Sequence, residues 1–196
     1  MTAAGAPPVV PATAPRTVLH LITTLTQGGA ERVLSDVVPR PEERGEDGSP
    51  ERHVVVSLAP GGMFADALRA RGVEVRDLGM RPGQDLVRGV RRLRAIRREL
   101  RPVLVVGWMY HACLLAWLAA PRGGDGVVWF LQGSLHTLAG LPWHTRLTIR
   151  LLARASRWPA AVAINSRAGL EHHAELGYRP RRWILLPNGC DTAVFR

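Results

Sequence analysis

Residues 17–38 read TVLHLITTLTQGGAERVLSDVV, and the order of elements within this stretch decides the fold. Thr17 to Leu25 is rich in apolar and β-branched residues, which is typical of a strand covered on both faces of a sheet. A glycine pair, Gly28 and Gly29, follows, and the apolar residues after it recur at helical spacing. The stretch therefore predicts a buried strand, a tight turn and an amphipathic helix in succession.

The glycine pair makes this turn a candidate binding site. Glycine has no Cβ, so the backbone can turn sharply and a ligand can approach it closely. The first N–H groups of the helix have no partner within the helix, and they can bind an anion or a sugar hydroxyl. Glu31 suits the positive end of the helix dipole. A tight strand-to-helix connection without a ligand is the alternative, and the motif by itself leaves both open.

Composition indicates one ordinary domain. The chain has 196 residues, 46% of them hydrophobic, which suffices for one sizeable core. Its net charge of +10 comes from arginine without any lysine, and we attribute this to a coding bias. Neither a basic stripe with stacking aromatics nor a nucleic-acid-binding module is present, so we expect no nucleic-acid partner. Cys113 and Cys190 do not form a disulfide framework or a zinc site, which favours a reducing compartment.

Two segments bear on membrane targeting. Residues 1–16 are rich in alanine and proline and lack the apolar core of a signal peptide, so we expect a disordered leader. Residues 103–120 read VLVVGWMYHACLLAWLAA, an uncharged run that is just long enough to span a bilayer. Polar residues at its centre and its valine-rich start favour a strand followed by a buried helix.

The rest of the sequence alternates strands and helices. Further strands are expected at residues 53–58, 73–78, 103–106, 127–131, 160–164 and 183–186, and helices at 63–71, 85–100, 112–120, 146–157 and 167–176. Connections of this length require mostly parallel strands. We therefore expect an α/β fold with a Rossmann-like, doubly wound sheet and helices on both faces. The domain is expected at residues 17–187, and an interdomain linker begins at residues 188–196.

Ligands of such sheets collect beyond the carboxyl ends of the strands. The residues expected there are polar, aromatic or glycine: Gly28, Gly29, Trp108, His111, Gln132, Gly133, Asn165 and Ser166. The first turn lacks the G-x-G-x-x-G pattern and the second strand lacks a terminal acid, so NAD or FAD binding is not expected. The sequence contains no Walker A motif, no nucleophile elbow and no cluster with metal-ligand spacing.

Several motifs resemble the N-terminal domain of glycosyltransferase family 4. Residues 28–34 (GGAERVL) look like the opening of that domain, and Arg101-Pro102 with the next strand resembles its RPDVV strand, with Val103 in place of Asp. Residues 165–169 (NSRAG) resemble its sixth strand and the helix behind it. Residues 186–195 (LPNGCDTAVF) are similar to the IPNGxDxxxF segment that leads into the second domain.

This resemblance implies one half of a GT-B enzyme of retaining type. Such a hexosyltransferase moves a sugar from a nucleotide-sugar to a glycan, lipid-linked or small-molecule acceptor, as in polysaccharide or glycolipid biosynthesis. The N-terminal domain mainly holds the acceptor. No metal or other cofactor is implied, because helix N-termini and basic side chains stabilise the departing diphosphate. The expected location is the cytoplasm or the inner face of a bacterial membrane.

The resemblance also assigns roles to the candidate residues. Gly28 and Gly29 would lie against the donor phosphate or the transferred sugar. The acceptor side would comprise Gln27, Trp108, Tyr110, Gln132, Gly133, Asn165 and Ser166.

The catalytic residue differs from the family pattern. Many relatives carry a histidine at the end of the fifth strand, where this chain has Gln132, which carries no proton at neutral pH. Either His136 or His111 substitutes for it, or the role is absent. The alternatives are purely structural: Trp108 and His111 pack in the core, and Asn165-Ser166 only caps a helix.

The chain stops at Arg196, where the second domain of such an enzyme would begin. We therefore expect a C-terminal donor-binding domain in cis or in trans, and little activity from this chain alone. The competing interpretation is a non-catalytic binding or membrane-surface module on the same fold. Residues 85–100 predict an amphipathic helix with an arginine-rich face, which can contact an anionic membrane or simply face solvent.

Overall fold

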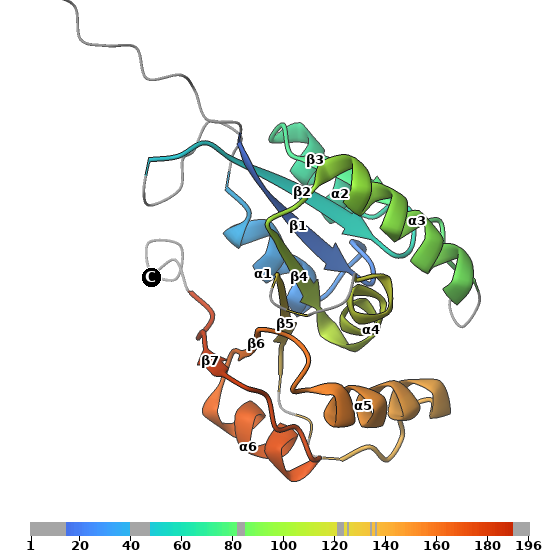
Figure 1. Ribbon diagram of the computed structural model, residues 1–196, viewed down its shortest axis with the longest axis vertical. Helices are drawn as coiled ribbons and strands as arrows, with labels where there is room; N and C mark the ends of the chain where they lie inside the picture. The colour runs from blue at the N-terminus through green and yellow to red at the C-terminus, as the bar shows by residue number, and fades with distance from the viewer. Residues whose placement is uncertain are drawn as a thin grey trace, which may run out of the picture.

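The computed structural model describes residues 15–39, 48–81, 85–120, 124, 126–133, 135 and 137–189. Seven strands form one sheet in the order β3-β2-β1-β4-β5-β6-β7, and each neighbouring pair is parallel (Figure 1). The strands are β1 (Arg16–Ile22), β2 (Glu51–Ser57), β3 (Glu74–Asp77), β4 (Leu104–Trp108), β5 (Val127–Leu131), β6 (Ala161–Ile164) and β7 (Trp183–Leu185). The predicted Rossmann-like α/β sheet is confirmed.

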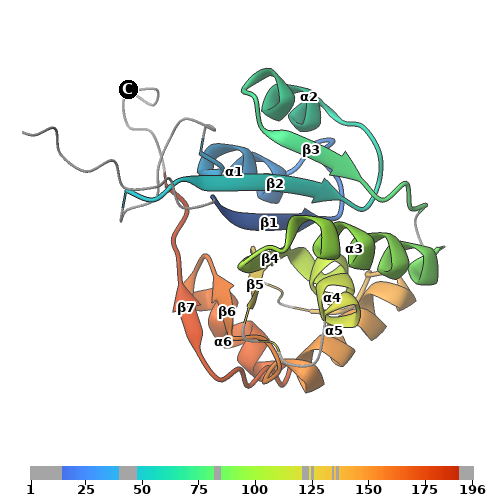
Figure 2. The same ribbon diagram turned by 45° about the horizontal axis from the view of Figure 1, so that its top comes forward.

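Helices cover both faces of the sheet. They are α1 (Gly29–Val37), α2 (Met63–Ala70), α3 (Leu86–Leu100), α4 (Met109–Ala119), α5 (Trp143–Ala155) and α6 (Arg167–Glu175). Figure 2 shows α1 and α2 on one face and α3, α4 and α5 on the other. The helices change face because the strand order changes direction after β3. The first three strands run from β1 outward to β3 at the sheet edge, and the chain then returns to place β4 on the other side of β1.

The strand and helix predictions hold, and their boundaries move at the carboxyl edge of the sheet. The first strand ends at Ile22, and the last residues of the predicted strand belong to the turn that follows it. Helix α4 begins at Met109 and α5 begins at Trp143, each three residues earlier than predicted. Met109 has a φ of 65°, so the chain passes from β4 into α4 through one left-handed residue that is neither glycine nor asparagine.

Some predictions fall outside the described residues. These are the leader at residues 1–14 and the linker residues 190–196. The uncharged run at residues 103–120 forms β4 and α4, as predicted. Within the described ranges, no helix combines the length and apolar character needed to cross a bilayer.

The larger core lies between the sheet and α3, α4 and α5. Helix α4 is its centre, and it buries Ala112, Cys113, Leu115 and Ala116 against the sheet. It packs very close to β4, because a Cβ on Gly107 would stand only 3.0 Å from the Cα of Cys113. Each buried leucine of this kind contributes ~1.5–3 kcal/mol to folding. The apolar content of residues 112–120 is therefore explained by burial within the protein.

A chain of hydrogen bonds crosses the sheet on the α1–α2 face. Trp108 Nε1 donates to Nδ1 of buried His20 over 3.3 Å, and this fixes the His20 proton on Nε2. His20 Nε2 then donates to His53 Nδ1 over 3.0 Å, and His53 Nε2 lies 3.3 Å from Glu51 Oε2. Burial, followed by the nearby His53, lowers the pKa of His20 to about 3. His20 is therefore a neutral structural residue, in agreement with its position inside a buried strand.

The turns at the carboxyl edge are joined by backbone hydrogen bonds. Ala59 N–H donates to the Thr23 carbonyl over 3.1 Å, and Phe64 N–H donates to the Leu25 carbonyl over 3.0 Å. Gly62 lies between these segments with a φ of +116°, and a Cβ there would overlap the carbonyl group of Leu25. The turn after β2 therefore supports the turn after β1 and holds the beginning of α1 in place.

We expect the Gly62→Ala variant to lose about 2 kcal/mol or more of unfolding free energy, because alanine meets both backbone overlap and an unfavourable φ. Gly29→Ala is the matched control. A Cβ at Gly29 meets nothing within 4 Å, and alanine favours the helix that starts there. Urea denaturation of the two variants checks the prediction, and equal midpoints would contradict it.

We also expect acid to destabilise the fold through His20. As pH falls below about 6.5, the unfolded chain protonates this histidine while the folded chain does not, until the pH approaches 3. The unfolding free energy should therefore fall by roughly 2–3 kcal/mol between pH 7.5 and pH 4.5 from this residue. Urea denaturation of His20→Gln should show a shallower pH dependence than the unmodified chain. The Val37→Gln variant, which changes an exposed side chain that does not titrate, should retain the original slope.

Candidate functional site

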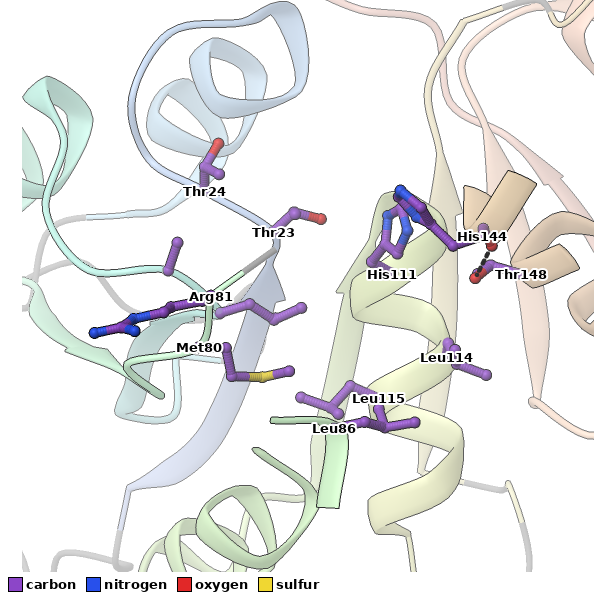
Figure 3. A pocket seen from close by; sticks show the side chains of 12 residues that line it. Thr23, Thr24, Met80, Arg81, Leu86, His111, Leu114, Leu115, His144 and Thr148 are labelled. Atoms are coloured by element: carbon purple, nitrogen blue, oxygen red, sulfur yellow. Dashed lines mark hydrogen bonds between the residues drawn. The ribbon is translucent and has the colours of Figure 1, made fainter. Parts of the chain in front are cut away.

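A cavity of about 280 Å³ lies at the carboxyl edge of the sheet, between the segments that follow β1, β2 and β3 and the helices on one face (Figure 3). It is placed where the chain changes from one face of the sheet to the other, which is where open parallel sheets bind ligands. The residues that line it are Thr23, Thr24, Leu58, Ala59, Met80, Arg81, Leu86, His111, Leu114, Leu115, His144 and Thr148.

The floor of the cavity continues the sheet beyond its strands. Leu58 N–H donates to the Ile22 carbonyl over 2.8 Å, and Met80 N–H donates to the Leu58 carbonyl over 2.9 Å. These bonds extend the parallel backbone pairing beyond the last residues of β1, β2 and β3. The lining residues that follow the three strands are therefore held by the same backbone pairing as the sheet.

Two threonines bring hydroxyl groups to the cavity from the turn after β1. Thr24 Oγ1 donates to Oε1 of Glu31 in the first turn of α1, over 2.8 Å. The Glu31 carboxylate folds back over Gly28, and a Cβ at Gly28 would overlap it. The Glu31 side chain thus connects the cavity wall to the start of α1.

The predicted donor residues lie in this same turn. Gln27, Gly28 and Gly29 are exposed, and Gly28 precedes the first residue of α1. The Glu31 carboxylate occupies the space that a Cβ at Gly28 would need. Nothing lies within 4 Å of the position that a Cβ would take at Gly29. The helix start is therefore open to an approaching ligand from the side of Gly29.

Two histidines face each other from neighbouring helices. His111 lies in the first turn of α4 and His144 in the first turn of α5, with ring centroids 5.8 Å apart. Burial, followed by the nearness of His144, lowers the pKa of His111 below that of an ordinary imidazole. His111 is therefore neutral at neutral pH, and one of its ring nitrogens can accept a hydrogen bond from a hydroxyl group.

A second group of predicted residues lies farther along the edge, after β5 and β6. Gly133 N–H donates to Asn165 Oδ1 over 3.0 Å, and Ser166 Oγ accepts from Gly169 N–H over 3.1 Å at the start of α6. Ser166 therefore caps this helix. The Gln132 Nε2 atom is buried and has no hydrogen-bond partner in the described part of the chain.

Trp108 and Tyr110 do not line the cavity. Trp108 is only 2% exposed and packs against Phe130 on the α1–α2 face, with ring centroids 4.6 Å apart. The Tyr110 hydroxyl lies 2.9 Å from His173 Nε2, and His173 Nδ1 bonds to the carbonyl of Gly169 over 2.7 Å. This chain of bonds connects α4 to α6.

The structure thus brings His111 to the cavity and leaves the other predicted residues around it or in the core. His136 lies outside the described residues. Sequence reasoning missed Thr23, Thr24 and His144. The sequence predicts a strand over the two threonines and a helix that begins only at residue 146. His144 nevertheless shares with His111 a position in the first turn of a helix that follows a strand.

One arginine contributes charge to the cavity lining. Arg81 is exposed and is the one charged side chain among the described lining residues when the histidines are neutral. Among the residues that the structure describes, no group of three or more histidine, cysteine, aspartate or glutamate side chains is arranged to hold a metal ion.

Solved structures share this fold. The chain superposes on HepE from Anabaena in complex with UDP and glucose, with a TM-score of 0.66 and 22% identity, over 91% of this chain and 46% of HepE. A HepE complex with UDP gives a TM-score of 0.65 at 20% identity, with the same coverage of both chains. MurG from Acinetobacter baumannii gives 0.55 at 12% identity, over 90% of this chain and 47% of MurG. The chain thus corresponds to about half the length of these GT-B structures.

The sequence comparisons identify the family. No curated protein matches the chain in sequence. The model of glycosyltransferase family 4 matches residues 27–194, which include the glycine turn and the strands and helices after it. The chain therefore belongs to glycosyltransferase family 4.

Proposed function

We propose that this chain is the acceptor-side half of a retaining glycosyltransferase, which moves a hexose from a nucleotide-sugar to a hydroxyl group of an acceptor. The observation that carries the proposal is the cavity at the carboxyl edge. It is lined by the threonine hydroxyls of the α1 turn and by a neutral histidine. These groups are suited to bind a hydroxylated molecule.

The donor approaches the start of α1. HepE, which has a similar fold, was solved with UDP and glucose, and this supports a nucleotide-sugar as the donor here. Gly29 offers an open helix N-terminus, and the helix dipole stabilises negative charge at that end. Gly28 and Gly29 therefore lie against the donor phosphate or the transferred sugar, with Gln27 beside them.

The acceptor occupies the cavity, and His111 contacts its reacting hydroxyl. The lowered pKa keeps the imidazole neutral, so it can accept the hydroxyl hydrogen and orient the oxygen toward the donor sugar. Gln132, Gly133, Asn165 and Ser166 form the adjoining edge, which we assign to the acceptor side. Trp108 and Tyr110 do not contact the acceptor, and they contribute by holding β4 and α4 in position.

Catalysis requires a second, donor-binding half. The GT-B structures that this chain resembles are about twice as long as the part it matches. The donor half supplies the opposite wall of the cleft and most contacts to the nucleotide. We therefore assign little turnover to the present chain unless that half is supplied in the same polypeptide or as a separate one.

The experiment measures sugar transfer from a panel of nucleotide-sugars by this chain combined with a donor-binding half. His111→Gln should lower kcat/KM by about 100-fold or more, since glutamine cannot take up the proton. The unmodified enzyme should keep its activity below pH 6.5, because His111 stays neutral there.

His172→Gln, on α6 and away from the cavity, is the matched control and should leave kcat/KM unchanged. Absence of transfer from every nucleotide-sugar tested, with both halves present and folded, would contradict the proposed function.

The outer face of α3 favours a second candidate, a peripheral contact with an anionic membrane. Arg88, Arg91 and Arg98 are exposed along one side of this helix, while Leu93 and Leu100 are buried in the core. These leucines are already used for packing, and the contact proposed for the arginine face is electrostatic.

We expect the chain to bind phosphatidylglycerol vesicles at low ionic strength and to lose that binding near 0.5 M salt, where charges are strongly screened. Replacing Arg88, Arg91 and Arg98 by glutamine should weaken the binding, and vesicles of phosphatidylcholine should not be bound. Vesicle sedimentation measures all three. Binding that is unchanged by salt or by the triple substitution would rule out this contact.

A further inference from the structure

The cavity has two chemically different ends. Figure 3 shows Thr23, Thr24, His111 and His144 at one end and Met80, Leu86, Leu114 and Leu115 at the other. The polar end adjoins the turn that leads to the glycine pair. The other end runs along α4 toward the start of α3, and its labelled side chains are apolar except for Arg81, which lies beside Met80. A molecule that fills both ends must itself have a hydroxylated part and an apolar part.

The cavity as a whole is large enough to bind a molecule with a substantial apolar part. The whole cavity measures about 280 Å³, whereas an apolar cavity of roughly 150 Å³ already holds a benzene ring. Apolar walls hold water poorly, because they offer it no hydrogen-bond partners. A sugar has no apolar part of this size, so a sugar alone leaves this end of the cavity without a suitable occupant.

Exposed apolar side chains flank the cavity on both sides. On α3, Leu86 lines the cavity and is 45% exposed, and Val87 beside it is 72% exposed. On α5, Trp143 is 70% exposed and packs edge-on against His144, and Leu147 is 47% exposed next to the lining residue Thr148. A compact aryl group would be contained in the cavity, whereas a long chain would continue over these side chains.

We propose that the acceptor is a lipid-linked sugar, whose apolar chain enters the cavity beside Leu86, Leu114 and Leu115 while its sugar lies at Thr23, Thr24 and His111. This inference rests on the proposed function, because it names the acceptor class of the same site. The chain leaves the cavity across Leu86 and Val87. The reacting hydroxyl is thereby held next to the α1 turn.

The test compares three probes that share one sugar: methyl, phenyl and octyl β-D-glucopyranoside, each below its micelle concentration. Binding to the 196-residue chain is followed by NMR of the backbone amides. Octyl glucoside should bind at least tenfold more tightly than methyl glucoside and more tightly than phenyl glucoside. Its shifts should concentrate at Leu58, His111 and Leu115.

Two variants test the location. Leu115→Trp fills the apolar end and should reduce octyl glucoside affinity to that of methyl glucoside. Leu86→Gln changes only a half-exposed side chain at the mouth, so it should keep the fold and still lose at least threefold in octyl glucoside affinity. Val37→Gln, on α1 at the opposite face and 54% exposed, is the matched control and should bind as the unmodified chain does.

Equal affinities for the methyl and octyl compounds, or shifts centred on α1 and α2, would overturn the inference. Tighter binding of the phenyl compound than of the octyl compound would replace the lipid chain by an aryl group, and would also overturn it. No donor is present in this measurement. A chain that prefers octyl glucoside and yet transfers no sugar therefore contradicts the proposed function alone.

Discussion

The crossover from β3 to β4 is the constraint on which the rest of this structure depends. After three strands the chain returns to the middle of the sheet and pairs β4 with β1, so the helices change from one face to the other at that point. The right-handed crossover leaves α1 and α3 on opposite faces, and neither covers the carboxyl ends of β1 and β4. The cavity, the α1 turn and His111 all lie at this opening.

Two buried histidines hold the segment that forms one edge of this opening. His20 satisfies the indole N–H of Trp108, and His173 satisfies the hydroxyl of Tyr110. An unpaired polar group in the core costs about 1–3 kcal/mol, so such pairs are needed wherever large aromatic residues carry a polar atom inside. Trp108 and Tyr110 stand one residue from Met109 on either side, and they fix the left-handed junction from which α4 and His111 start.

The site and the core therefore share one segment. Within residues 108–111, Trp108 and Tyr110 pack in the core and Met109 has a strained backbone. The fourth residue, His111, faces the cavity. Strain of this kind persists only where the surrounding structure enforces it, and here both neighbours are held by hydrogen bonds. Such a segment positions an imidazole more firmly than a loop does, which suits the role that we propose for His111. The aliphatic residues Leu114 and Leu115 one turn later extend the same helix into the apolar end of the cavity.

The sequence by itself determined the sheet, the alternation of strands and helices, and the family, because buried β-branched runs and glycine turns are local signals that tertiary contacts reinforced. It also placed His111 and the α1 turn at the carboxyl edge. The tertiary structure decided which residues of that edge face the cavity. Trp108 and His111 follow the same strand, yet the left-handed turn at Met109 sends them to opposite faces of the sheet. His144 meets His111 only because α4 and α5 pack side by side, and this contact between distant segments leaves no trace in local sequence.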